Sequence, residues 1–285
     1  MTLPFLKWVG SKRRLLPQLQ PYLLRSSPMY CEPFLGSGSV FFNLQPAKAV
    51  LQDINPCLIA TYLQIRDNFD GLSMELELLH NCHLVLNEPQ RQTDYLAKRE
   101  EFNCLPTTAQ RRAALFIFLN RTCFNGVFRV NRQGKFNVGF GRYKKPKIYN
   151  PPTLQACHQI LQNAELKVAP FDSLDLESFP KGSFFYLDPP YIPVSPTANF
   201  TNYSAGGFNL ASQEKLARFC DRLDRKGMYF LLSNSDTEWC RQTYRHYNQT
   251  KVYRRGTINS DPTKRQKVTE LLIYNYPVED MAKVS

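Results

Sequence analysis

The sequence predicts an α/β fold in which helices cover both faces of a sheet and a mainly helical segment with a β-hairpin is inserted. Short strand-like and helix-like segments alternate in residues 1–58 and again in residues 160–285. Such alternation is typical of an α/β sheet. Residues 59–159 instead resemble helices joined by loops. We therefore expect two domains, one of which interrupts the other.

The first 58 residues are expected to run from strand through turn and helix to a second strand, and a further helix follows. Asn55 and Pro56 mark the start of that last helix, because asparagine is a favoured helix cap and proline suits the first turn. The expected segments, in order, are residues 28–31, 35–38, 40–44, 49–52 and 58–69.

The inserted segment contains a buried helix and a hairpin. Residues 113–119 are apolar on nearly every side, which indicates a helix inside the protein. Residues 121–147 are rich in Gly, Asn, Arg and Phe, and residues 131–135 separate two alternating stretches. This pattern predicts a hairpin turn.

Strand and helix patterns return in the last third of the chain. The apolar residues of segment 211–225 recur at helical spacing, so we expect one amphipathic helix there. Four strands are expected around it, at residues 166–169, 184–187, 228–232 and 268–276.

The charge of the chain is concentrated in one block. The formal net charge is +12, and residues 102–164 hold ten Lys or Arg and no Asp or Glu. A one-sided basic block points to a polyanionic partner such as a nucleic acid. The alternative is a positive face that only serves solubility, but the aromatic residues among the charges favour the partner.

The cysteines and histidines predict no metal site. Eight cysteines occur singly, without a C-x-x-C pair, and we expect buried free thiols in a reducing compartment. The one local cluster, residues 80–83, is expected on a solvated helix surface. The sequence shows neither a leader nor a run of apolar residues long enough to span a membrane, so we expect a cytoplasmic protein.

A glycine-rich turn and an aspartate predict a nucleoside site. The turn at 35–38 follows a strand and opens a helix, so the backbone can approach a ligand closely there. Asp53 ends the next strand, and ligands of α/β sheets bind at the carboxyl ends of strands. A carboxylate there can accept both hydroxyls of a ribose. The alternative for Asp53 is a helix-start residue.

The most specific motif is Asp188-Pro189-Pro190-Tyr191, directly after the apolar strand 184–187. Proline fixes the backbone and donates no hydrogen bond, but its carbonyl remains an acceptor. The Asp188 carboxylate and the Pro189 carbonyl can therefore hold an exocyclic amino group, and Tyr191 offers a flat face to an extruded base. The alternative is a strand exit with a turn.

These motifs, in this order, resemble the Dam family of DNA adenine-N6 methyltransferases, the D12 class, over nearly the whole chain. The resemblance rests on residues 7–12, 32–39, 120–126, 136–143 and 188–191, together with Asp53, Phe171, Asp172 and segment 197–201. It implies a Rossmann-like methyltransferase sheet, a catalytic domain of residues 1–58 and 160–285, and a DNA target-recognition domain of residues 59–159. It also implies S-adenosylmethionine as cofactor and methylation of a flipped adenine in double-stranded DNA, within GATC or a related site (EC 2.1.1.72).

The resemblance assigns roles by position. The catalytic residues would be Asp188, Pro189, Pro190 and Tyr191. The cofactor would contact Trp8, Lys12, Glu32, Pro33, Phe34, Gly36, Gly38, Asp53, Phe171, Asp172 and Asp188. DNA would contact Lys7, Arg121, Phe124, Asn125, Val127, Arg129, Gly139, Arg142, Lys144 and Asn199.

Two positions depart from the family pattern. Phe124 stands where the family often has tyrosine, so stacking on DNA survives without a hydroxyl contact. Gly139 stands where proline often touches a thymine methyl, and glycine cannot make that contact. An RNA amino-group methyltransferase and a DNA cytosine-N4 methyltransferase are the alternatives. We expect a monomer of prokaryotic or phage type that needs no metal and no membrane.

Overall fold

The computed structural model describes residues 2–191, 208–255 and 267–278. The chain forms two compact units. The first consists of Met1–Ser11, Gly36–Gln45 and Asp53–Val168, and the second of Lys12–Leu35, Pro46–Gln52 and Ala169–Ser285. Residues 59–159, expected as an insertion, thus lie within the first unit.

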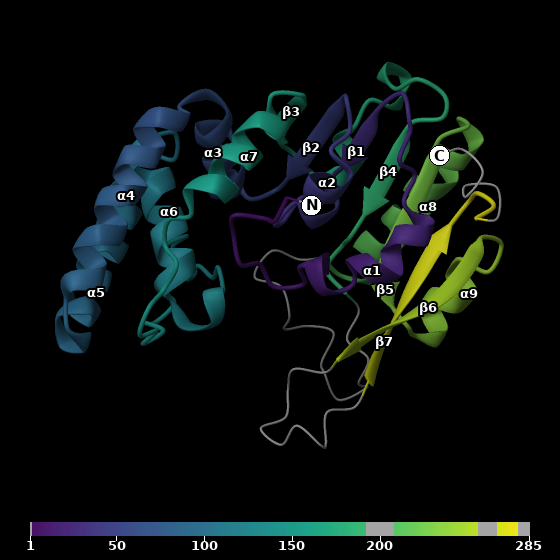
Figure 1. Cartoon of the computed structure of the whole chain (residues 1–285). Helices are drawn as coiled ribbons and strands as arrows, with labels where there is room; N and C mark the ends of the chain where they lie inside the picture. Colours follow the sequence, from purple (N-terminus) through teal and green to yellow (C-terminus); the bar gives the residue numbers. More distant parts are fainter. Residues whose placement is uncertain (1, 192–207, 256–266, 279–285) are drawn as a thin grey trace. The chain divides into compact units, whose positions relative to one another are not determined.

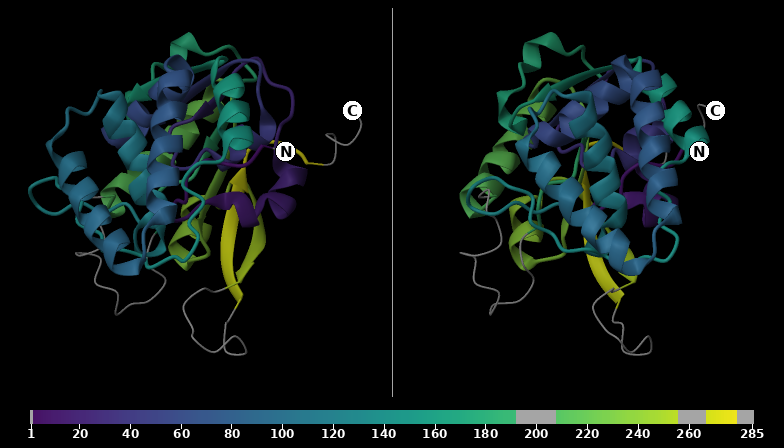
Figure 2. Two further views of the ribbon diagram at one scale, coloured as in Figure 1. Left: turned by 60° about the vertical axis from the view of Figure 1, so that its left-hand side comes forward. Right: turned by 90° about the vertical axis from the view of Figure 1, so that its left-hand side faces the viewer.

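The second unit contains six strands of the seven-stranded sheet, in the order β2-β1-β4-β5-β7-β6. The four strands β2, β1, β4 and β5 are parallel, and β7 runs antiparallel to both β5 and β6. The hairpin of β6 and β7 is yellow-green and yellow in Figures 1 and 2. The strands are β1 (Tyr30–Glu32), β2 (Ala49–Asp53), β4 (Phe184–Leu187), β5 (Tyr229–Ser235), β6 (Asn248–Arg255) and β7 (Lys267–Tyr274).

A single apolar core joins this sheet to helix α8 (Leu210–Arg225). The expected stripe of Leu216, Phe219, Cys220 and Leu223 is buried, and Asn209 caps the helix by accepting from the Ser212 amide. The amphipathic helix that the sequence predicts is therefore confirmed. The remaining helical segments of the unit are short: η1 (Lys12–Arg14), α1 (Leu16–Leu19), η2 (Gln20–Tyr22), η4 (Phe171–Ser173), η5 (Leu176–Ser178) and α9 (Glu238–Thr243).

The first unit is mainly helical. Helices α4 and α5 each pack against α6, and α6 is buried along most of its length, as residues 113–119 predict. Helix α3 begins after Asn55, whose side chain accepts from the amides of Cys57 and Leu58. The elements are α2 (Ser39–Leu44), α3 (Pro56–Asp67), α4 (Phe69–Val85), α5 (Glu88–Cys104), α6 (Gln110–Thr122), η3 (Phe124–Gly126), α7 (Pro151–Leu161) and β3 (Ala164–Val168).

The expected hairpin in the first unit is a turn without a strand ladder. Asn131 Oδ1 accepts from the amides of Gln133 and Lys135, which closes the turn where the sequence predicts it. The only backbone pairings assigned nearby among the described residues are isolated bridges, between Val130 and Phe136 and between Cys123 and Phe140. Strand-like alternation over so few residues forms single bridges, not β-strands.

Two expectations about histidine and cysteine hold only in part. Asn81 and Cys82 of the cluster 80–83 are exposed, as expected, and five thiols are buried, as expected: Cys31, Cys123, Cys157, Cys220 and Cys240. His83 is completely buried, with its ring edge-on to Phe118 and Nδ1 3.3 Å from Asp94, instead of lying on a solvated surface. Cys82 and Cys104 are exposed thiols, while Cys57 is half-buried. In the part of the chain that the structure describes, no group of His, Cys, Asp and Glu could hold a metal ion, and no helix is long and apolar enough to cross a membrane.

Candidate active site and nucleic-acid interface

The Asp-Pro-Pro-Tyr motif emerges from the middle of the sheet in the second unit. Strand β4 pairs with β1 on one side and β5 on the other, and it ends at Leu187, so Asp188 lies at its carboxyl end. Asp188 Oδ1 is 2.7 Å from Nζ of Lys12, and their side chains are 19% and 4% exposed. The catalytic carboxylate that the sequence predicts is thus accessible and paired with an ammonium group.

A second carboxylate, Glu270 of β7, belongs to the same cluster. The Tyr191 hydroxyl donates to Glu270 Oε2 at 2.7 Å, and Lys12 Nζ lies 3.8 Å from that oxygen. The Lys12 ammonium is also 4.7 Å from the centre of the Tyr191 ring. Sequence reasoning missed Glu270. Its one signal is an acidic residue directly before the apolar run 271–274, because a carboxylate buried there needs a partner.

Burial and neighbouring charges act in opposite directions on the pKa of Asp188, and other side chains hold the proline pair that follows it. Burial raises the pKa of Asp188, the Lys12 ammonium opposes that rise, and the Glu270 carboxylate adds to it. The carbonyl of Pro190 accepts from Gln213 Nε2 at 2.9 Å, and Asn234 Nδ2 in turn donates to Gln213. The second proline is therefore tied to the protein, and the motif is held by side chains from α8 and β5.

Two predicted cofactor contacts of the second unit lie against each other. The rings of Phe34 and Phe171 are stacked with centroids 5.2 Å apart, and Phe208 meets Phe34 edge-on. Gln52 Nε2 donates to the carbonyl of Pro170 at 2.6 Å, which fixes the start of η4. This aromatic cluster offers apolar faces suited to a planar heterocycle.

Other predicted cofactor residues of this unit have protein partners. Asp172 lies 3.7 Å from the Lys215 ammonium. Glu32 is buried and accepts from the Tyr30 hydroxyl at 2.6 Å, while Pro33 is also buried.

In the first unit, Asp53 organises the glycine-rich turn. Its Oδ2 accepts from the Gly36 amide at 3.0 Å and its Oδ1 from the Asn55 amide at 2.9 Å. Burial raises the pKa of Asp53, and these amides oppose the rise. Asn55, not Asp53, caps helix α3. The helix-start role that was the alternative for Asp53 is thus filled by its neighbour.

These residues fit the ribose of a nucleoside cofactor. A carboxylate has about four acceptor positions, and the backbone amides of Gly36, Asn55 and Ile54 occupy only part of them. The Tyr62 hydroxyl donates to the Gly36 carbonyl at 3.1 Å, so both sides of the glycine are held. Gly38 has a left-handed backbone and is the N-cap residue directly before α2. The turn therefore presents an oriented carboxylate beside close-lying backbone.

Gly36→Ala is expected to weaken cofactor binding at least tenfold and to lower stability by about 1 kcal/mol or more. Gly36 has φ +48, and an added Cβ would lie 2.8 Å from the Trp8 ring. Calorimetric titration with S-adenosylmethionine and thermal unfolding measure the two effects. Gly134→Ala, at φ +74 in open space, is the control: it shares the backbone strain and should bind the cofactor normally.

Three serine hydroxyls connect the N-terminal motif to this turn. Ser11 and Ser39 lie 2.8 Å apart, and Ser37 Oγ is 3.0 Å from Ser11 and 2.9 Å from Ser39. Trp8 stacks on Phe128 with ring centroids 6.1 Å apart. Sequence reasoning included Trp8 but missed the serines.

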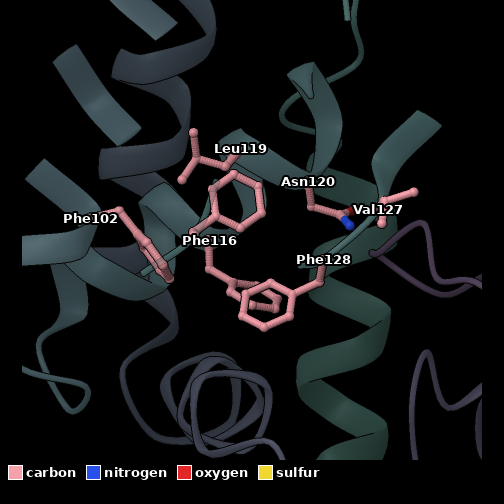
Figure 3. A pocket seen from close by; sticks show the side chains of 7 residues that line it. Phe102, Phe116, Leu119, Asn120, Val127 and Phe128 are labelled. Carbon is pink, nitrogen blue, oxygen red and sulfur yellow. The ribbon is translucent and has the colours of Figure 1, made fainter. Parts of the chain in front are cut away.

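Asn120 brings together two predicted DNA-contact segments of the first unit. Its amide accepts from the Lys7 backbone N–H at 2.8 Å and donates to the carbonyls of Lys7 and Gly126, at 2.7 and 3.0 Å. Figure 3 shows Asn120 beside Val127, at the edge of an aromatic pocket. Asn120 is 4% exposed. Nothing in the local sequence pattern indicates this role, because both partners are backbone groups.

The loop that Asn120 holds presents an exposed aromatic ring. The Phe124 amide donates to the Gly139 carbonyl at 2.8 Å, and the Phe124 side chain is 61% exposed. Asn125 has φ +55, which turns the chain sharply beside it. Lys7 Nζ lies 4.2 Å from the centre of the Tyr143 ring, and burial together with Arg121 lowers its pKa. Lys7, Phe124, Asn125 and Gly139 therefore form one connected surface.

The basic residues that are predicted to contact DNA differ in their hydrogen bonding within the protein. Arg121 donates to the Phe5 carbonyl, and Arg129 Nε donates to Asn137 Oδ1 at 2.9 Å. Arg142 is exposed with Nε 4.0 Å from Glu88, and Lys144 is exposed. Asn199 lies outside the described residues.

Comparisons with known proteins agree with this fold and these motifs. The family model for D12 class N6 adenine-specific DNA methyltransferases matches residues 8–258. The type II methyltransferase M.MjaIII of Methanocaldococcus jannaschii is 38% identical over 96% of this chain and 99% of its own length. The type II methyltransferase M1.LlaDCHI of Lactococcus lactis subsp. cremoris is 37% identical over 96% and 95%. A DNA adenine methylase of Serratia marcescens is 37% identical over 94% and 96%.

The fold is that of the Rossmann-like methyltransferases, as the sequence predicts. The chain belongs to the D12 class of N6 adenine-specific DNA methyltransferases.

Proposed function

We propose that this chain transfers a methyl group from S-adenosylmethionine to N6 of a flipped adenine in double-stranded DNA, within GATC or a related site (EC 2.1.1.72). The observation that carries the proposal is Asp188, an accessible carboxylate at the end of a central strand, followed by a rigid pair of prolines. We further propose residues 59–159 as the target-recognition domain and a monomer acting on DNA in a prokaryotic cytoplasm. The names of the relatives, which include DNA adenine methylases, support the substrate.

The chemistry of the site rests on hydrogen bonding to a weak nucleophile. S-adenosylmethionine would supply a methyl group bonded to a sulfonium sulfur. Transfer breaks the S–CH3 bond and leaves a neutral thioether, which is a good leaving group. The lone pair of adenine N6 is delocalised into the ring, so the acceptor needs activation. The Asp188 carboxylate and the Pro189 carbonyl accept hydrogen bonds from its two N–H groups, favour a pyramidal nitrogen, and so direct the lone pair. The proton that N6 loses as the N–CH3 bond forms passes to the Asp188 carboxylate and from there to water. Positioning and electrostatics, without a covalent enzyme intermediate, supply the acceleration.

The chain's own residues hold the cofactor in this proposal. The Asp53 carboxylate accepts from the ribose hydroxyls, and the Gly36 turn allows close approach of the backbone. Phe34 and Phe171 pack on the adenine, and Asp172 accepts from its amino group. Trp8 and Lys12 enclose the methionine end. Backbone amides direct Asp53, so it meets the ribose already oriented.

DNA binding in this proposal rests on the surface that Asn120 holds. The target atom lies inside the base stack, so the adenine must be extruded. The exposed Phe124 ring fills the space that it leaves, Asn125 lies beside the orphaned partner base, and Lys7 contacts a guanine at the edge of the site. The exposed Lys and Arg residues of segment 132–147 neutralise phosphates.

Analysis of methylated nucleosides tests the function. The purified chain would be incubated with labelled S-adenosylmethionine and either duplex DNA or structured RNA, and the digested products separated. N6-methyladenine from duplex DNA supports the proposal. N4-methylcytosine, or label only in RNA, would overturn it in favour of the corresponding alternative. Sequencing the modified positions then gives the recognition site.

Arg129→Ala is expected to relax specificity at one base pair by roughly 1–3 kcal/mol. Asn137 holds the guanidinium, as a base-reading side chain requires. The measurement is kcat/KM on duplexes substituted singly at each position of the site. Arg132→Ala, at an exposed position in the turn, is the control and should weaken all duplexes equally. A uniform loss for Arg129→Ala would make this residue a phosphate contact.

A further inference from the structure

One ammonium and two carboxylates share the cluster at the end of β4. Lys12 Nζ lies 2.7 Å from Asp188 and 3.8 Å from Glu270, so Asp188 is its nearer partner. Lys12 belongs to η1 and Glu270 to β7, which are distant in the chain. The charges of the three groups sum to −1. Both carboxylates lie within reach of the Lys12 ammonium.

The two carboxylates differ in access. The Asp188 side chain is 19% exposed, whereas those of Glu270 and Lys12 are 3% and 4% exposed. A ligand can therefore reach Asp188 but not Glu270. Glu270 must act through protein groups, of which Lys12 and the Tyr191 hydroxyl are two.

The pairing of Lys12 with Asp188 competes with substrate binding. One bond to an ammonium group leaves acceptor positions on the Asp188 carboxylate free, but the positive charge weakens the hydrogen bonds that its oxygens accept from a neutral amino group. In the proposed reaction, Asp188 must accept from adenine N6. Asp188 therefore accepts more strongly from adenine N6 when the ammonium that holds it before the base arrives moves closer to another carboxylate.

We propose that Glu270 is a positioning residue that receives the Lys12 ammonium when a substrate amino group engages Asp188. This inference rests on the proposed function of Asp188. The movement needed is about 1 Å, from 3.8 Å to a charge-assisted distance of about 2.8 Å. A lysine stem is flexible enough for that shift. The Tyr191 hydroxyl, which donates to the same glutamate oxygen, keeps Glu270 in place meanwhile.

Substituting glutamine for Glu270 distinguishes the proposed reception of Lys12 from a merely structural role of Glu270. Glu270→Gln keeps the size and an amide oxygen that can accept from Tyr191, but it removes the charge that receives Lys12. Glu270→Asp keeps the charge on a shorter side chain. If Glu270 only held Tyr191, the glutamine variant would behave like the native protein.

The test measures single-turnover methylation at saturating duplex DNA and S-adenosylmethionine, across pH. Glu270→Gln is expected to slow the step about tenfold, with the affinity for S-adenosylmethionine unchanged, and Glu270→Asp to retain more of the rate. The acid limb of the pH–rate profile should move to lower pH in the Glu270→Gln protein. The reason is that the Glu270 charge raises the pKa of Asp188, and glutamine removes that charge. Of the described residues, the titratable groups that act on Asp188 are Lys12, Glu270, Tyr191 and Tyr186.

A second background and a control complete the experiment. In a Lys12→Met background, adding Glu270→Gln should change the rate by less than about twofold, since no ammonium remains to be received. Asp236→Asn removes a comparably buried carboxylate that pairs with Arg241 and Lys251, and should leave the acid limb in place.

An unmoved acid limb in Glu270→Gln, or an equal rate loss with and without Lys12, overturns the inference. Failure of the proposed function would appear differently, as a native protein whose product is not N6-methyladenine.

Discussion

Asp188→Ala is expected to lower the rate of methyl transfer by roughly a thousandfold or more. The affinity for duplex DNA should stay within about twofold of that of the native protein. The carboxylate lies at the end of β4 and is the accessible member of its charged cluster. Its removal takes away one of two acceptors for the adenine amino group. The other, the Pro189 carbonyl, remains, so a base can enter the site but its nitrogen is not directed.

Asp188→Asn and the pH dependence sharpen this prediction. An asparagine can keep one acceptor oxygen but carries no charge, and its amide group would donate toward the substrate nitrogen; we expect it to be nearly as inactive as alanine. In the native protein, burial raises the pKa of Asp188. The ionised form is required, so the rate should fall as pH drops through that raised value.

The measurements are single-turnover rates and DNA affinities by fluorescence anisotropy. Retained methylation of adenine in the Asp188→Ala protein would remove the carboxylate from the mechanism. Loss of DNA affinity in parallel with the rate would make Asp188 a structural or DNA-binding residue.

Asn120→Ala is the second large effect. It leaves three backbone groups without their side-chain partner, the N–H and carbonyl of Lys7 and the carbonyl of Gly126. Asn120 is buried, so we expect a loss of about 3 kcal/mol in the free energy of unfolding. The Lys7 segment and the Phe124 loop also lose their common support, so specific methylation should fall more than stability alone explains.

Thermal unfolding and kcat/KM on specific against unrelated duplexes measure the two losses. Asn275→Ala is the matched control, because Asn275 accepts from the Phe230 backbone N–H and donates to the Met228 carbonyl, outside the predicted DNA-contact segments. It should destabilise the protein but leave the Lys7 contact intact. If both variants lose specificity equally, Asn120 serves stability alone.

Local signals explain which elements could be predicted. Residues 184–187 form β4 as expected, because four apolar residues are followed there by Asp-Pro-Pro. Helix α8 begins one residue earlier than expected. Strand β6 was missed, since Asn248–Arg255 is mostly polar and lies at the edge of the sheet. An edge strand needs only backbone partners, which leave little trace in side-chain patterning.

The residues of the candidate site also fall into those that a local motif predicts and those that it does not. Asp188, Asp53 and the glycine-rich turn belong to contiguous motifs and were found from them. Glu270 and Asn120 act on residues distant in the chain, so no local spacing reveals them. Such partners become visible only when the fold brings a buried polar side chain beside a group that needs it.

The division of the chain also limits how this protein can be taken apart. The polypeptide passes between the two compact units five times, at Ser11, Leu35, Gln45, Gln52 and Val168. No single cut releases either unit. A fragment of residues 53–168 would lack the N-terminal segment that satisfies Asn120. Fusion or truncation designs should therefore keep the chain whole and place new modules at its ends.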